Sequence, residues 1–399
     1  MFCNKLFSQE NFIENLLKTK PVNFENILNN QSKYEVQIIF TQINRDKKNK
    51  PILITHSYQT GSNQYFYPAS TVKLPASILA LEKINQLNIK GLTKFSTMIT
   101  GANAENQTKV LKDTTAQNGL PSIAHYIKKI LLVSDNDAFN RLYEFIGQKE
   151  LNERLHSLGF QNTNIVHRLE ANLTAEQNKT TNPIDFFEDK KLIYAQKTQY
   201  NSENYQPQKL IKKGIGYLNA AGKLINEPLD FSLKNEFSLV DQHLFLHKLI
   251  FPENFSKKER FNLTKIDYDF IYRYMSMLPQ ESDFPNYQKS DYWPSYCKFL
   301  LLGSDSTQPW PQNIRIFNKV GDAYGYLIDN AYIVDYEHNV EFFLSVVIHC
   351  NEDQIYNDNK YEYDTVGLPF MKNLGQLFLD YEKKRTKKYL PKLQKIKYR

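Results

Sequence analysis

The sequence predicts an α/β fold in which strands from both ends of the chain form one sheet and an all-helical subdomain is inserted between them. Two observations lead to this prediction. Segments of alternating, β-branched residues stand near the start and near the end of the 399 residues, and the long region between them shows mainly helical spacing of apolar residues. Since strands far apart in a sequence can share a sheet, we expect one discontinuous unit rather than two domains in series.

The elements are predicted in chain order. A short helix over 11–17 precedes two strands, over 34–42 and 51–55, which form a hairpin across a charged turn. After Pro68 the apolar residues recur three and four positions apart, which predicts a helix over about 71–87. The remaining predictions are helices over 123–132, 138–146, 149–158, 239–250, 268–277 and 368–381, and paired strands over 324–333 and 341–349.

These elements define the expected domains. Residues 1–75 and 311–399 would form the sheet domain, which ends in a basic tail from residue 383. Residues 76–310 would form the helical subdomain, enlarged by an expansion at about 188–312.

Composition narrows the class of protein. A hydrophobic content of 41% and a charged content of 23% are those of a globular chain and exclude wholesale disorder. The formal net charge is +7, but nine Lys and Arg residues stand between Lys383 and Arg399, and the rest of the chain carries −2. We therefore interpret the basicity as a solvated C-terminal extension and expect no nucleic-acid partner.

Three cysteines, Cys3, Cys297 and Cys350, are too few for a disulfide framework, and their spacing fits no metal site. No apolar run approaches the length that spans a bilayer, and the first residues lack the apolar segment of a signal peptide. Cys3 followed by polar residues suits the mature end of a lipoprotein, with a plain free cysteine as the alternative. We expect no cofactor, no metal, and membrane association only through a lipid anchor at Cys3.

Ser70 and Lys73 form a Ser-x-x-Lys motif at the expected start of the first long helix. The spacing brings a hydroxyl and an ammonium group to one face of the helix. A lysine of lowered pKa can take the serine proton, and the free N–H groups at a helix start can stabilise developing negative charge. The motif alone is weak, because Ser295 and Lys298 repeat it, which we interpret as coincidence.

Two further motifs follow in order. Ser134-Asp135-Asn136 stands between two predicted helices, and Lys319-Val320-Gly321 precedes the C-terminal strand pair. With the segment Tyr67–Pro75 around Ser70, they resemble the motifs of class A β-lactamase-like serine hydrolases, in the superfamily of β-lactamases and penicillin-binding proteins. The resemblance implies an αβα sandwich with an antiparallel sheet, and a monomer that acts through an acyl-Ser70 intermediate.

A fourth segment, Arg168-Leu169-Glu170 followed by Thr180-Thr181-Asn182-Pro183, resembles the Ω-loop of this family. In the family, the glutamate of that loop activates the water that hydrolyses the acyl-serine. A surface carboxylate is the alternative interpretation of Glu170.

The resemblance implies four catalytic residues and four substrate-binding residues. Ser70 would attack the carbonyl carbon, Lys73 would act as base or proton shuttle, and Ser134 would pass a proton to the leaving amine. Asn136 would hold the amide of the substrate and Lys319 its carboxylate, while the backbone N–H groups of Ser70 and Asp322 would form the oxyanion hole. The expected site is therefore Ser70, Lys73, Ser134 and Glu170 for catalysis, with Asn136, Lys319, Gly321 and Asp322 for substrate binding.

The sequence departs from the family at several positions. Val320 replaces the hydroxyl residue that helps to bind the substrate carboxylate, and Asp322 adds a negative charge where an anionic substrate would dock. The strand 324–333 contains no Arg that could compensate. Lys179 stands near the usual position of the aspartate that pairs with the loop arginine, so Arg168 needs another partner. These changes predict weak or altered recognition of penicillin-type carboxylates.

Two other features have structural interpretations. His243 and His247 share a helix face, but Leu244 stands where a metalloprotease would have glutamate, so we interpret the pair as structural. The expansion is rich in aromatic residues, which could line a substrate wall or pack an extra subdomain, and we favour packing: Tyr287, Tyr292, Trp293, Tyr296 and Trp310.

We therefore predict a serine hydrolase of the class A β-lactamase-like type, acting on a small-molecule β-lactam or a peptidoglycan-like amide. One alternative is a D-Ala-D-Ala-type peptidase, an esterase or a penicillin-binding protein using the same serine. Another is a non-catalytic envelope-binding protein that has kept the scaffold. Because the chemistry of such substrates takes place outside the cytoplasm, we expect a periplasmic or cell-envelope location and a signal peptide that has been removed.

Overall fold

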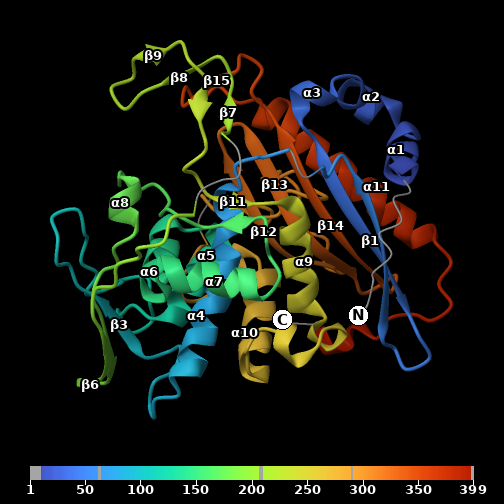
Figure 1. Ribbon diagram of the computed structural model, residues 1–399. Coiled ribbons are helices and arrows are strands. Elements are labelled where there is room, and N and C mark those ends of the chain that lie inside the picture. Colours follow the sequence, from blue (N-terminus) through green and yellow to red (C-terminus); the bar gives the residue numbers. More distant parts are fainter. Residues whose placement is uncertain (1–9, 62–63, 206–209, 289–290, 397–399) are drawn as a thin grey trace.

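The computed structural model describes residues 10–61, 64–205, 210–288 and 291–396. Cys3, the expected lipid anchor, lies outside these residues. The centre of the structure is a five-stranded antiparallel sheet with strand order β12-β13-β14-β1-β2 (Figure 1). Its strands come from both ends of the chain, as predicted: β1 (Gln37–Arg45), β2 (Pro51–Tyr58), β12 (Ile314–Ala323), β13 (Tyr326–Asp335) and β14 (Val340–His349).

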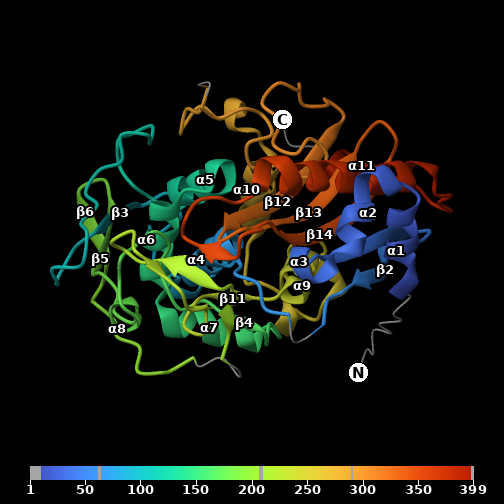
Figure 2. The ribbon, with the colours of Figure 1, turned by 90° about the horizontal axis from the view of Figure 1, so that it is seen from above.

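Helices cover both faces of this sheet, which confirms the predicted αβα sandwich. Figure 2 shows the strands between α11 (Leu368–Lys384) on one side and α9 (Leu239–Ile250) on the other. Every residue of β13 and β14 is buried, because both faces pack against helices. On the α11 side the chain also contributes α1 (Glu10–Lys18), α2 (Pro21–Asn29) and α3 (Gln31–Tyr34), and on the α9 side α10 (Lys265–Ser276).

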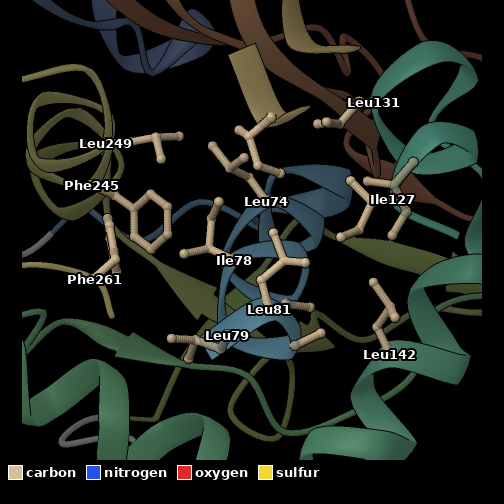
Figure 3. Close-up of a cluster of buried hydrophobic side chains, with 14 of the residues drawn as sticks. Leu74, Ile78, Leu79, Leu81, Ile127, Leu131, Leu142, Phe245, Leu249 and Phe261 are labelled. Carbon is tan, nitrogen blue, oxygen red and sulfur yellow. The ribbon is translucent and has the colours of Figure 1, made fainter. Parts of the chain in front are cut away.

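The second lobe is built around α4 (Lys73–Leu87), which is buried along most of its length. Leu74, Ile78 and Leu81 of α4 belong to one apolar cluster with residues from the neighbouring helices and from α9 (Figure 3). The predicted helix is confirmed, because the apolar residues spaced three and four positions apart form the part of α4 that packs in this cluster. The surrounding helices are α5 (Ile123–Val133), α6 (Asn136–Ile146), α7 (Gln148–Ser157) and α8 (Ala175–Asn178).

The inserted region is not all helical, which corrects the prediction. It contains a three-stranded sheet, β3-β5-β6, and several strands of two or three residues, which are too short to show a period in the sequence. In addition, α9 lies within the expansion but packs on the central sheet, while its apolar residues also join the cluster around α4. The strands are β3 (Thr97–Thr100), β4 (Thr163–Asn164), β5 (Ile184–Glu188), β6 (Lys191–Gln196), β7 (Lys212–Lys213), β8 (Gly216–Leu218), β9 (Leu224–Ile225), β10 (Leu229–Asp230) and β11 (Glu236–Phe237), with β15 (Ile355–Tyr356) pairing to β8.

The described part of the basic tail is partly docked on the protein, which corrects our interpretation in part, while Lys384, Lys388 and Lys392 are exposed as expected. Arg385 and Lys387 form ion pairs with buried Glu382, and Leu393 is only 4% exposed. Asn49, in the turn between β1 and β2, donates to the Leu390 carbonyl oxygen at 2.9 Å. Among the described residues, no helix combines the length and apolar character that crossing a membrane would require.

Candidate active site

Ser70 stands on a 3₁₀ turn, Ala69–Val72, that leads directly into α4. The residue before it, Ala69, has a φ of +47°, a left-handed conformation that is unfavourable for a residue with a Cβ atom. Thr71 closes the turn by donating from N and Oγ1 to the Pro68 carbonyl oxygen, at 3.1 and 2.7 Å. The turn thus leaves the Ser70 side chain half-buried while both neighbours are buried.

Two lysines converge on Ser134. Lys73 Nζ, in the first turn of α4, donates to Ser134 Oγ at 3.2 Å and also to the Ser134 carbonyl oxygen. Lys319 Nζ, from β12, donates to the same Ser134 Oγ at 2.8 Å and to the Val320 carbonyl oxygen at 2.8 Å. The three predicted motifs therefore meet at one hydroxyl group, beside the turn that carries Ser70.

Burial sets the protonation of both lysines. Lys73 is 0% exposed and Lys319 3% exposed, and removal from water disfavours the charged form of an amine. Burial, together with the positive charge of Lys319, holds the pKa of Lys73 well below its usual range, although Asp135 opposes the shift. Burial also lowers the pKa of Lys319. The lowered pKa makes the neutral form of Lys73, which can accept a proton, easier to populate than that of an exposed lysine.

Ser134 owes its position to the end of α5. It is the C-cap residue, with φ +60°, and its N–H donates to the Ile130 carbonyl oxygen. Asp135 then caps α6 by accepting from Ala138 N at 2.7 Å, and Lys129 Nζ lies 3.3 Å from its carboxylate. Asn136, the first residue of α6, is half-buried.

Gly321 allows β12 to approach the Ser70 turn. A Cβ atom at this position would lie 2.9 Å from the Pro68 carbonyl oxygen and 3.0 Å from Ser70 N, which is closer than real contacts of a Cβ atom. The main chain that carries Asp322 N–H therefore runs directly beside Ser70 N–H. This is an arrangement in which two N–H donors could meet one oxyanion.

The side chains on either side of Gly321 offer no binding group for an anionic substrate. Val320 is 2% exposed and belongs to the apolar cluster between the sheet and α11. Asp322 reaches solvent, and its closely packed surroundings raise the pKa of its carboxyl, whereas the positive charges of Lys319 and Lys73 oppose this. The negative charge of Glu170 also raises the pKa of Asp322, so the two carboxyl groups lie near each other.

Glu170 is exposed and has a φ of +48°. Among the residues that the structure describes, no hydrogen bond joins its carboxylate to Lys73 or Ser70. Leu169, just before it, exchanges two hydrogen bonds of 2.9 Å with the side chain of Asn140 on α6. The segment leading to Glu170 is thus fixed at Leu169, and the charge of Glu170 acts on the pKa of Asp322.

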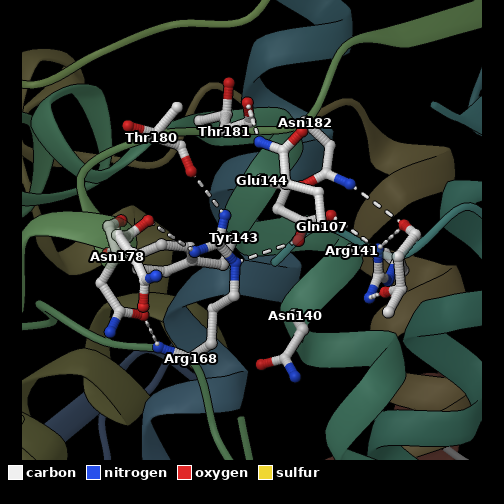
Figure 4. Close-up of polar contacts among 12 residues, drawn as sticks. Gln107, Asn140, Arg141, Tyr143, Glu144, Arg168, Asn178, Thr180, Thr181 and Asn182 are labelled. Carbon is white, nitrogen blue, oxygen red and sulfur yellow. Dashed lines mark hydrogen bonds and ion pairs between the residues drawn. The ribbon is translucent and has the colours of Figure 1, made fainter. Parts of the chain in front are cut away.

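The partner of Arg168 is Glu144 on α6, which the sequence did not reveal (Figure 4). Arg168 Nε donates to Glu144 Oε1 at 3.0 Å and its Nη2 to the Thr180 carbonyl oxygen at 2.7 Å. Arg141 Nη1 donates to the other Glu144 oxygen at 3.0 Å. Burial raises the pKa of Glu144, and both arginines oppose this shift. One buried carboxylate therefore replaces the aspartate that is missing near Lys179.

The features that we interpreted as structural stay outside this cluster. Ser295 Oγ donates to the Asp305 carbonyl oxygen, while Lys298 Nζ donates to Met275 O and Asn318 Oδ1, both at 2.6 Å. His243 and His247 are buried under the sheet, with ring centroids 4.3 Å apart. In the described part of the chain, no three His, Cys, Asp or Glu side chains are grouped so that they could hold a metal ion.

The aromatic residues of the expansion mainly pack together. Tyr287 is 8% exposed and contacts the cluster around Leu132, two residues before Ser134. Tyr292 lies 4.9 Å from the ring of Tyr287 and 5.1 Å from the ring of Tyr296. This ladder of rings supports the end of α5 from outside.

Comparisons with known proteins agree with this geometry. The sequence profile of the Beta-lactamase enzyme family matches residues 22–208, which include Ser70, Lys73, Ser134 and Glu170. No curated protein sequence matches the chain.

Among solved structures, a mutant of PBP-A in an acyl-enzyme complex with penicillin G is 14% identical and has a TM-score of 0.50, with 93% of this chain and 97% of that chain covered. A β-lactamase from Sphaerobacter thermophilus is 12% identical over 93% of this chain and 96% of its own, with a TM-score of 0.48. An ancestral class A β-lactamase, GNCA, is 12% identical, with 92% of this chain and 99% of that chain covered and a TM-score of 0.48. The chain has the β-lactamase and transpeptidase-like serine hydrolase fold.

Proposed function

We propose that this protein, which has the β-lactamase and transpeptidase-like fold, is a serine hydrolase that acts through an acyl-Ser70 intermediate on β-lactams or related amides. The observation that carries the proposal is the convergence of Lys73 and Lys319 on Ser134 Oγ beside the Ser70 turn. Burying two lysine side chains around one hydroxyl costs stability, and strongly perturbed pKa values gather at functional sites.

Acylation uses the buried cluster. Ser70 Oγ attacks the carbonyl carbon and gives its proton to neutral Lys73. The oxyanion accepts hydrogen bonds from the N–H groups of Ser70 and Asp322. Ser134 then delivers a proton to the leaving nitrogen and regains one from Lys73, so the carbon–nitrogen bond breaks while the new ester forms.

Deacylation uses Glu170. Its carboxylate takes a proton from a water molecule, the resulting hydroxide attacks the acyl-Ser70 carbonyl, and the proton returns to Ser70 Oγ as the ester breaks. Exposure of Glu170 to solvent supports this role, because water reaches the carboxylate directly. The L158E mutant of PBP-A, which shares the fold, forms an acyl-enzyme complex with penicillin G.

A second candidate is a peptidase or esterase that uses the same serine. Val320 and Asp322 favour the esterase, whose substrate needs no carboxylate, since the first supplies no hydroxyl and the second repels an anionic carboxylate. Binding without catalysis is the weaker alternative, because binding alone does not require Lys73 to be fully buried against Ser134. We further propose, as before, a monomer that works in the periplasm or cell envelope.

The test is to incubate wild type, Ser70→Ala and Glu170→Ala with a chromogenic cephalosporin and a fluorescent penicillin, recording turnover and intact mass. We expect turnover in wild type, no adduct in Ser70→Ala, and an accumulating adduct in Glu170→Ala. A stable adduct on wild type would indicate a penicillin-binding protein. If neither β-lactams nor simple acyl esters form an adduct, the assignment of Ser70 is wrong.

A further inference from the structure

The segment 165–169, which leads into Glu170, contains no helix or strand, yet each of its backbone N–H groups is bonded to a buried side-chain amide. The amides belong to four asparagines, none more than 7% exposed. The bonds run from Ile165 N to Asn152 Oδ1 (2.7 Å), from Val166 N and His167 N to Asn235 Oδ1 (2.8 and 3.0 Å), from Arg168 N to Asn178 Oδ1 (2.8 Å) and from Leu169 N to Asn140 Oδ1 (2.9 Å).

The carbonyl groups of the same segment are also bonded. Each accepts from a side-chain nitrogen, so no backbone group of the segment depends on solvent. The donors are Asn152 for Ile165 O (2.9 Å), Gln148 for Val166 O (2.6 Å), Asn235 for His167 O (3.2 Å), His167 Nδ1 for Arg168 O (2.7 Å) and Asn140 for Leu169 O (2.9 Å). Side chains here replace the ladder of a regular element and fix one conformation of the segment.

Asn235 differs from the other three asparagines in its origin. Asn140, Asn152 and Asn178 come from α6, α7 and α8, which lie close to the segment in sequence. Asn235 belongs to the expansion and stands just before β11, whose two residues pair with β4 immediately ahead of the segment. It is 0% exposed. Within the described part of the expansion, Asn235 is the residue whose side chain bonds directly to the backbone of 165–169, next to the short ladder of β11 and β4.

Asn235 also contacts the chain on the Ser70 side. The backbone carbonyl oxygen of Asn235 accepts a hydrogen bond of 3.0 Å from the hydroxyl of Tyr65, which stands five residues before Ser70. Tyr67, closer still to Ser70, stacks on the ring of His167 with an interplanar angle of 6° and a centroid distance of 6.1 Å. The residue thus joins the Glu170 segment to the strand-to-helix connection that ends in Ser70.

We propose that Asn235 is a positioning residue for Glu170: the expansion, through this amide, sets where the Glu170 carboxylate lies relative to acyl-Ser70. The proposal rests on the hydrolytic role of Glu170 proposed above. It assigns the expansion a part in deacylation, since displacing a catalytic group by about 1 Å can cost about a hundredfold in rate. Acylation, which uses the buried lysines and Ser134, does not require Asn235.

The experiment compares the full-length wild type with Asn235→Ala, Asn235→Asp and Asn219→Ala. Asn219 is a matched control, because its Oδ1 also accepts from two backbone N–H groups, those of Ala221 and Lys223, but in an exposed turn between β8 and β9. Intact mass after rapid mixing with penicillin G gives the acylation rate, and decay of the adduct after removal of free penicillin gives the deacylation rate. Hydrogen exchange of the peptide containing 165–170 reports the segment itself.

We expect deacylation at least about tenfold slower in Asn235→Ala, with acylation within about threefold of wild type and faster exchange confined to the 165–170 region. Asn235→Asp keeps the acceptor for both N–H groups and loses only the donor to His167 O, so we expect an intermediate rate. It also carries the test if Asn235→Ala does not fold. Asn219→Ala should deacylate as wild type.

Two results would overturn the assignment of Asn235. One is wild-type deacylation in Asn235→Ala despite faster exchange in the segment, and the other is an equal fall of acylation and deacylation in both Asn235 variants. Failure of the proposed function is distinct from these. Wild type would then form no adduct, or its adduct would decay no faster than that of Glu170→Ala, and the role of Asn235 would fall with it.

Discussion

Ser70, Lys73, Ser134 and Lys319 stand at the ends of helices or within a strand, whereas Glu170 ends a segment with no regular structure. The first group is placed by backbone ladders and by the apolar contacts of α4, α5 and β12. Glu170 is placed by buried amides and by the Arg168–Glu144 ion pair. In a helix or strand, the relative positions of side chains follow from their spacing in the sequence. In a segment held by side chains, the conformation depends on residues from distant parts of the chain.

The largest expected effect concerns the buried lysine. Lys73→Met keeps the volume of the side chain but removes the amine that contacts Ser134, so acylation should slow by about a thousandfold, roughly 4 kcal/mol in activation free energy. The midpoint of urea unfolding should not fall, because replacing a desolvated amine by an apolar group is neutral or stabilising. Stopped-flow kinetics measure the acylation rate, and a urea titration measures the midpoint of unfolding. An acylation rate within tenfold of wild type would exclude Lys73 as the base.

The second prediction addresses the Glu170 segment. Glu144→Gln leaves Arg141 and Arg168 buried without their shared carboxylate, and should lower the free energy of unfolding by about 3 to 4 kcal/mol. Glu176→Gln, which removes an exposed carboxylate paired with half-buried Lys179, is the control and should leave the free energy of unfolding nearly unchanged. Urea unfolding measures both variants. Equal effects would mean that the ion pair does not hold the segment.

The third prediction tests the close approach of β12 to the nucleophile turn. In Gly321→Ala the new Cβ atom would meet backbone atoms of Pro68 and Ser70 at 2.9 to 3.0 Å, so the strand and the turn must separate. We expect kcat/KM to fall by about a hundredfold, because the two oxyanion donors would no longer be aligned. Gly61→Ala, where a Cβ atom meets nothing within 4 Å, should leave kcat/KM unchanged.

The fourth prediction is a dependence of stability on pH within the Glu170 segment. Burial lowers the pKa of His167 to about 4, so the folded state binds fewer protons than the unfolded state below the ordinary histidine pKa of about 6.5. Stability from His167 is therefore complete above pH 6.5 and is lost as the pH falls toward 4, by about 2 kcal/mol between pH 6.5 and pH 5. His167→Asn should flatten this part of the profile. The free energy of unfolding is measured by urea titration at pH 6.5 and pH 5. If it falls between these pH values as much in His167→Asn as in wild type, the prediction is wrong.

The smallest expected effect concerns substrate charge. Asp322→Asn removes an exposed negative charge next to Gly321, so this variant should raise kcat/KM for an anionic penicillin by about threefold. A neutral acyl ester should show no such gain. Steady-state kinetics give kcat/KM for the penicillin and for the ester. An equal gain in kcat/KM on the two substrates would show that charge is not the cause.

Much of the fold was visible in the sequence. The hairpin of β1 and β2, the pairing of β13 with β14 and the burial of α4 follow from alternation and helical spacing. The third C-terminal strand, β12, was not predicted as a strand, although it carries Lys319. The short strands of the expansion and the docking of the tail on Glu382 depend on long-range pairing, which leaves no local period to read.

The sequence by itself determined the set of candidate catalytic residues: Ser70 with Lys73 one turn later, Ser134 at a helix end, and Lys319 two residues before a glycine. Those residues are fixed by local spacing and by the order of motifs along the chain. Only the tertiary structure decided that both lysines meet at Ser134 Oγ, that Glu144 replaces the missing partner of Arg168, and that Asn235 supports the segment before Glu170. The physical reason is that a buried polar group must find a hydrogen-bond partner, and the partner that folding brings within reach need not be near in sequence.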